Sequence, residues 1–61
     1  MNANEFFEAS LKMVESPSIR AWASNDHNRP IWLEICQNSI NNKKADPSVM
    51  AAYIVAVAIG L

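Results

Sequence analysis

His27 and Cys36 are the side chains of this sequence best suited to nucleophilic chemistry, because an imidazole can activate a thiol. A working site also needs a cleft, an oxyanion hole and a third group that orients the base. A chain of 61 residues leaves little room for all three. Cys36 also falls on an apolar helical stripe, where a cysteine is usually a small buried hydrophobe. We therefore expect no catalytic residues and no enzymatic activity.

Metal and cofactor sites are not expected either. Asp26, His27 and Cys36 come nearest to a ligand set, but one cysteine with one histidine falls short of the four ligands of a structural zinc site. The single glycine, Gly60, excludes a glycine-rich phosphate loop. Residues 24–28, SNDHN, have the side chains of a turn that caps its own backbone. No metal and no cofactor is predicted.

The length and composition predict one small folded domain over residues 1–61. Hydrophobic residues make up 51% of the chain, which is typical of a folded protein rather than a disordered one. A chain this short buries only about 60% of the surface that it exposes when unfolded, so its core needs a supplement. One cysteine cannot form an internal disulfide. Self-association is the supplement that remains.

The charge balance argues against two classes of partner. The formal net charge is -1 and the pI is about 5.6, so no overall positive field attracts nucleic acid or an anionic membrane. The first residues, MNANEFFEASLK, lack both the basic start and the apolar segment of a secretory signal. With a lone thiol, this pattern predicts a cytoplasmic protein.

Three prolines divide the chain into four pieces, each of which reads as a helix. Ser16-Pro17 and Asp46-Pro47 place a good N-cap residue before a proline at the first helical position. Pro30 follows the turn at residues 24–28 and marks a third start. The fold class expected is therefore all-α, a small bundle of four short helices completed by self-association. The expected helices span residues 3–15, 17–24, 30–43 and 47–60.

The last piece carries no charged side chain after Asp46, and as a helix it is apolar on every side. Its 14 helical residues span about 21 Å, which is too short for a bilayer core of about 30 Å. A strand is also disfavoured, because no other segment supplies a pairing partner. The remaining explanations are a helix wrapped by its own chain, a weak interfacial membrane anchor, and a helix covered partly by a second copy or another protein. We prefer the last.

The expected self-association interface follows a line of small residues, Ala52, Ala56 and Gly60, which lets two helices approach closely. Larger apolar side chains complete it. These are Met50, Ile54, Val57 and Leu61.

Arg20, Trp22, Arg29 and Trp32 are the candidates for binding a partner, because tryptophan and arginine are enriched at binding hot spots. The alternative for both tryptophans is that they fill the core. The function predicted is a non-enzymatic protein-interaction module that acts through helix–helix contacts. Whether it serves as an inhibitor, an adaptor or an assembly subunit stays open.

Two other functions are weighed against this one. The second and third pieces form a helix-turn-helix pattern, and the third carries amides able to pair with adenine edges, although basic residues are few and Glu34 would face phosphates. The amides are Gln37, Asn38, Asn41 and Asn42, and the basic residues in reach are Arg20, Arg29, Lys43 and Lys44. A peripheral membrane-associated peptide is the other alternative.

Overall fold

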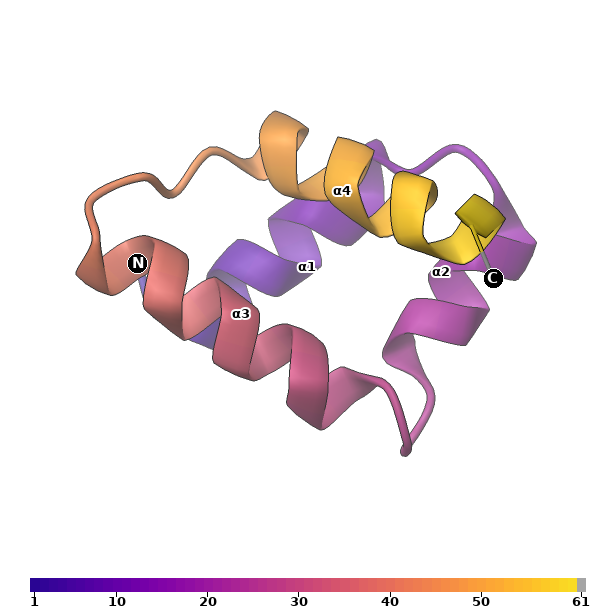
Figure 1. Cartoon of the computed structure of the whole chain (residues 1–61), viewed down its shortest axis with the longest axis horizontal. Helices are drawn as coiled ribbons and strands as arrows, with labels where there is room; N and C mark the ends of the chain where they lie inside the picture. Colours follow the sequence, from indigo (N-terminus) through magenta and orange to yellow (C-terminus); the bar gives the residue numbers. More distant parts are fainter. Residues whose placement is uncertain (61) are drawn as a thin grey trace.

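The computed structural model describes residues 1–60, which form four α-helices joined by short connections (Figure 1). The helices are α1 (Ala3–Met13), α2 (Pro17–Ser24), α3 (Arg29–Asn41) and α4 (Pro47–Gly60). No strand occurs in the described residues. The all-α class with four short helices is therefore confirmed.

Local capping chemistry explains where α1 begins and ends. The Asn2 side chain accepts a hydrogen bond from the Glu5 N–H at 2.8 Å, and the Glu5 carboxylate accepts one from the Asn2 N–H at 3.1 Å. α1 ends at Met13, two residues earlier than the sequence pattern predicted. The reason is Val14, whose backbone is extended and whose side chain is buried in the core with 1% of its surface exposed.

α2 and α4 begin with the same arrangement, a polar cap followed by proline. The Ser16 hydroxyl oxygen accepts a hydrogen bond from the Ile19 N–H at 3.3 Å. The Asp46 carboxylate accepts two hydrogen bonds from Ser48, one from its hydroxyl at 2.8 Å and one from its N–H at 3.0 Å. These bonds lower the pKa of Asp46 below its usual value, because they stabilise the ionised carboxylate.

The turn between α2 and α3 is closed by two asparagines. The Asn25 side-chain oxygen accepts hydrogen bonds from the N–H groups of His27 and Asn28, at 2.9 and 2.8 Å. The Asn28 amide donates to the carbonyl of Trp22 at 2.8 Å, which ties the start of α3 to the end of α2. The side chains of residues 24–28 thus act on the backbone of their own turn.

α3 begins at Arg29 and ends at Asn41, whereas the sequence pattern predicted residues 30–43. Lys43 has a φ of 56°, in the left-handed region, and its N–H donates to the carbonyl of Ile40 at 3.0 Å. The Lys44 N–H donates to the carbonyl of Ser39 at 2.9 Å. This backbone reversal satisfies the last carbonyls of α3 and ends the helix.

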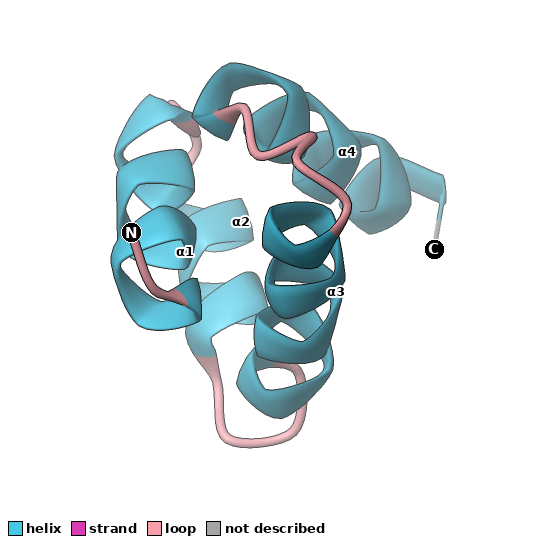
Figure 2. Ribbon diagram, turned by 90° about the vertical axis from the view of Figure 1, so that its left-hand side faces the viewer, coloured by secondary structure: helices cyan, strands magenta, loops and turns pink. Residues whose placement is uncertain are grey.

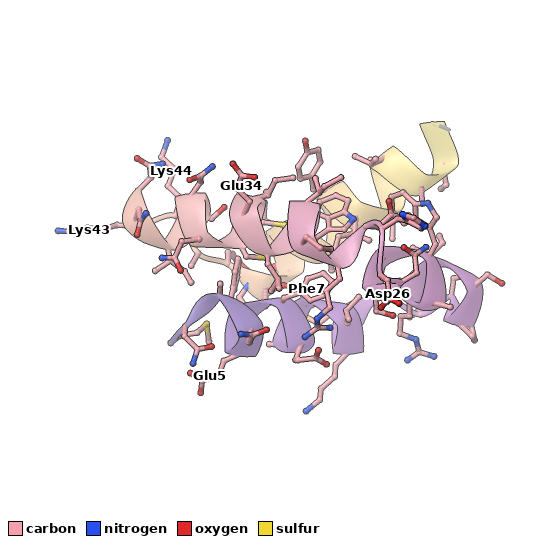
Figure 3. All side chains as sticks on the ribbon, turned by 90° about the horizontal axis from the view of Figure 1, so that it is seen from below. Glu5, Phe7, Asp26, Glu34, Lys43 and Lys44 are labelled. Atoms are coloured by element: carbon pink, nitrogen blue, oxygen red, sulfur yellow. The ribbon has the colours of Figure 1, made fainter. Side chains whose placement is uncertain are left out.

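α1 packs against both α3 and α4, and α2 packs against both α3 and α4 at one end of the molecule. Figure 2 shows α1 and α3 as two columns, with α4 crossing above them and α2 behind. Phe7 lies between the ribbons of α1 and α3 (Figure 3). The core is built from all four helices and the Val14 link. Its members are Phe6, Phe7, Leu11, Val14, Ala23, Trp32, Cys36, Met50, Ala51 and Ile54.

Candidate interaction surface

His27 and Cys36 lie in different environments. Cys36 is fully buried in the core, and this burial raises the pKa of its thiol from 9.0 to about 11. His27 is exposed in the turn before α3. A buried neutral thiol is a poor nucleophile and a poor metal ligand, so this cysteine serves the packing of α3. Across residues 1–60, no three His, Cys, Asp or Glu side chains are grouped closely enough to hold a metal ion.

The four partner-binding candidates are close in sequence but occupy different places in the fold. Arg20 is exposed on α2, whereas Trp32 is a core residue with 3% of its surface exposed. Trp22 is half-buried and meets the Trp32 ring edge-on, with centroids 6.1 Å apart. Arg29 is turned towards α1. The four therefore do not form one patch.

Arg29 is engaged within its own chain. Its guanidinium lies 2.9 Å from the Glu8 carboxylate, 3.4 Å from the Asn4 side-chain oxygen and 5.1 Å from the centre of the Phe7 ring. These contacts fasten the start of α3 to the outer face of α1 through an ion pair and a cation–π contact. Arg29 acts in this structure as a packing residue.

An apolar hollow of about 320 Å³ opens between α3 and α4, with Trp32 at its base. Tyr53 of α4 crosses Trp32 edge-on, with centroids 5.3 Å apart. We call this feature the α3 hollow. Its lining residues are Trp22, Asn28, Ile31, Trp32, Ile35, Tyr53 and Val57. The residues predicted for binding did not include Ile31, Ile35 or Tyr53. The sequence of a helix does not indicate which other helix it contacts.

A second, shallower apolar hollow lies on the opposite flank of α4, against the end of α1. It is lined by Met13, Ser48, Ala51, Ala52 and Val55. We call it the α1 hollow. Met13 exposes 52% of its surface although it is a large apolar residue. α4 thus has an apolar hollow along each of its two flanks.

The predicted interface residues of α4 divide into inward and outward groups. Met50 and Ile54 expose 5% and 0% of their surface and belong to the core of their own chain. Val57 is half-buried in the α3 hollow. Ala52, Ala56 and Gly60 are exposed. Leu61 lies outside the described residues.

The outward side of α4 is as apolar as its buried side. Val49 and Ile59 expose 63% and 74% of their surface. A methyl group added at Gly60 would meet no atom within 4 Å among the packed residues that the structure describes. We call the exposed residues Val49, Ala52, Ala56, Ile59 and Gly60 the outer face of α4.

Exposed large hydrophobic residues gather around this helix. Among residues 1–60 there are six, and only Met1 lies neither on α4 nor in a hollow beside it. The other five are Met13, Ile31, Val49, Tyr53 and Ile59. No charged side chain lines either hollow, and α4 has none. The outer face and the two hollows therefore form one neutral apolar surface, which we call the α4 surface.

The amide-bearing side of α3 is polar and exposed. Gln37 donates to Asn41 at 3.0 Å, and the Asn42 side chain donates to the Asn38 carbonyl at 2.9 Å, so several of these amides are paired locally. Figure 3 shows Glu34 on α3 and Lys44 just beyond the end of α3, both on the side away from α1. An acidic group therefore shares this side of the helix with the basic one.

Comparisons with known proteins found no family model, no curated protein and no solved structure that matches this chain. In the part of the chain that the structure describes, no helix is both long and apolar enough to cross a membrane.

Proposed function

We propose that the protein is a non-enzymatic, cytoplasmic protein-interaction module that binds through helix–helix contacts at the α4 surface. The observation that carries this proposal is the outer face of α4, where Val49 and Ile59 are largely exposed and no side chain of residues 47–60 is charged. A helix at the surface of a soluble domain normally turns a polar face to water. A helix that is apolar on its outer side is normally covered, and the covering group here is another protein chain.

The exposed apolar surface is not the result of a loosely folded chain. The chain exposes 4010 Å², and a compact monomeric protein of 6.8 kDa is expected to expose about 4000 Å². The exposed area of the chain is therefore that of a compact protein of its mass. What is unusual is the concentration of apolar residues on one side, which favours an interaction surface over an incomplete core.

This proposal explains why the same chain would suit several roles. An inhibitor, an adaptor and an assembly subunit each need a rigid apolar surface that another helix can cover. α4 is held rigidly because Met50, Ala51 and Ile54 anchor its inner side in the core. The outer face can therefore present its side chains in a fixed arrangement, which lowers the entropic cost of binding.

Helix-turn-helix DNA binding is the second candidate, because α2, the turn and α3 place exposed amides near Lys43 and Lys44. Glu34 shares this side of α3, and the net charge of -1 weakens attraction to phosphates. A salt-titrated DNA-binding assay separates the two functions. DNA binding requires an affinity that falls steeply with salt, whereas the interaction module shows no measurable DNA affinity.

Peripheral membrane attachment is the remaining alternative, since an apolar helix face can lie in a lipid interface. The α4 surface lacks the basic residues that draw such helices to anionic lipid. Flotation with anionic vesicles tests this directly. The proposal predicts that the protein stays with the soluble fraction, and co-flotation would favour membrane attachment.

The proposal is tested by asking whether another molecule covers α4 inside the cell. A thiol is introduced by Ala56→Cys on the outer face and, as a matched control, by Ala21→Cys at an exposed helical position on α2. We expect a cell-permeable maleimide to label position 56 several-fold more slowly than position 21, because a bound chain covers it. Wild-type protein measures the background from buried Cys36.

Equal labelling rates at the two positions in cells would contradict the proposal. The comparison should be repeated with the purified variants after mild denaturation in urea. There the two thiols are expected to react at the same rate, because the difference arises from coverage and not from the intrinsic reactivity of either thiol.

A further inference from the structure

Four of the five residues on the outer face of α4 have a symmetric order. Val49, Ala52, Ala56 and Ile59 are separated by three, four and three positions, and their sizes run large, small, small, large. At 3.6 residues per turn, all four lie within an arc of about 80°. The centre of this pattern is position 54, the middle of the helix. Read from either end, these four residues present the same order of sizes.

We infer that the chain covering α4 is a second copy of the same chain, packed antiparallel about a two-fold axis at position 54. This inference rests on the proposed function and names its partner. In such a pair, Ala52 of one copy faces Ala56 of the other, and Val49 faces Ile59. Small residues meet small residues at the centre, and large apolar residues meet at both ends.

The alanines at the centre determine how closely the two helices approach. Interaxial distances between packed helices range from about 8 to 10 Å, and small residues at the contact give the shorter ones. Exposed Val49 and Ile59 then close over the ends of the contact, where each gains cover that its own chain does not provide. A face with bulky residues at the centre and small ones at the ends would hold the helices apart.

A stable dimer needs a wider apolar surface than α4 alone provides. A standard interface buries about 800 Å² on each partner, which is about a fifth of the 4010 Å² that this chain exposes. α4 alone, about 21 Å long, is narrow for such an area. Met13 in the α1 hollow and Ile31 in the α3 hollow widen the apolar surface on both flanks.

The electrostatics favour a second copy over a charged partner. An acidic or basic partner would have to remove its charges from water against a surface that offers no counter-charge. A second copy brings an equally neutral surface, so no charge is left unpaired at the centre of the contact. The net charge of -1 per chain adds little repulsion between the two copies.

Disulfide cross-linking tests the predicted pairing. Val49→Cys and Ile59→Cys chains are purified separately, mixed, and oxidised with diamide. The antiparallel pair places positions 49 and 59 opposite each other, so the mixture should give a cross-linked heterodimer. Two copies of Val49→Cys alone should not cross-link, because ten helical residues separate their thiols by about 15 Å, and a disulfide needs Cα atoms within about 7 Å.

Cross-linking of Val49→Cys with itself, and not with Ile59→Cys, would show a parallel pairing and overturn the inference. Ala21→Cys is the matched control, because Ala21 is exposed on α2 and lies outside the α4 surface. We expect a mixture of Ala21→Cys with Ile59→Cys to give no cross-linked heterodimer. As much cross-linking with Ala21→Cys as with Val49→Cys would show that the thiols meet by random collision, and it would contradict the inferred pairing.

The failure of this inference is distinguishable from failure of the proposed function. If the purified protein gives no cross-link in any combination while Ala56→Cys is still protected in cells, the partner is a different protein. The second-copy inference is then wrong and the interaction module stands. If Ala56→Cys is unprotected in cells and the purified protein gives no cross-link, both are wrong.

Discussion

At the scale of single residues, burial decides what Cys36 can do. The thiol is fully buried between apolar neighbours, and its pKa is raised from 9.0 to about 11 because water no longer solvates the thiolate. At neutral pH it is therefore a protonated, packed side chain. The sequence already indicated this, since Cys36 falls on the same apolar stripe as Trp32.

The raised pKa of Cys36 predicts a loss of stability at alkaline pH. Between pH 9 and pH 11 the unfolded chain releases the thiol proton while the folded chain retains it, so rising pH favours unfolding. We expect the free energy of unfolding to fall across this range by about 2 to 3 kcal/mol more than in Cys36→Ala. Urea unfolding at a series of pH values measures it. Identical pH dependence in the two proteins would show that the thiol titrates normally.

Arg29 and Trp32 show where sequence reasoning about single residues stops. Both were candidates for partner binding because of their types, yet Arg29 bonds to Asn4 and Glu8 of α1, and Trp32 is a core residue. Asn4 is 25 positions from Arg29 along the chain. Contacts between residues so far apart in the sequence depend on how the helices pack. The residues next to them in the sequence do not indicate such contacts.

At the scale of helices, Trp32 joins three elements. It belongs to α3, meets Trp22 of α2 edge-on, and meets Tyr53 of α4 edge-on. The ring of Trp32 thus brings α3 into contact with α4.

Trp32→Ala should therefore destabilise the fold by about 3 to 5 kcal/mol, because it leaves a cavity where three helices meet. Ile31→Ala is the matched control, since Ile31 lines the same hollow but is 58% exposed, and it should cost less than about 1 kcal/mol. Urea unfolding by circular dichroism measures both. Equal costs for the two variants would show that Trp32 does not hold the helices together.

Helix starts could be predicted because their signals are local. Ser16-Pro17 and Asp46-Pro47 mark the starts of α2 and α4, and both cap side chains accept hydrogen bonds in the structure. Helix ends were less predictable. α1 stops early because Val14 turns into the core, and α3 stops early because Lys43 adopts a left-handed conformation. Each depends on packing or on backbone reversal rather than on a cap residue.

The inner and outer sides of α4 could not be predicted, because a helix that is apolar all round has no periodic signal. Met50 and Ile54 were grouped with Ala52 and Ala56 for this reason. The structure separates them, with the first pair in the core and the second pair exposed. Only the positions of the other three helices reveal which side faces the core.

At the scale of the whole molecule, the composition and the positions of the three prolines predicted the fold class and the number of helices. The exposed apolar surface on and beside α4 could be identified only from the structure. The exposed area of the chain is that expected for its mass, and within residues 1–60 five large apolar side chains are exposed on or beside α4. The size of the protein explains this, since three short helices can cover one side of α4 but cannot surround it.

The mass of the particle in solution tests the central claim most directly. We predict that sedimentation equilibrium of the wild-type protein gives twice the chain mass of 6.8 kDa at micromolar concentration. Ala56→Glu should sediment as a single folded chain, because Ala56 is exposed in the monomer and a charge there is buried only in the dimer. Ala21→Glu, at an exposed position on α2, should remain dimeric. A wild-type mass of 6.8 kDa at every concentration up to the millimolar range would contradict the claim that a second copy covers α4.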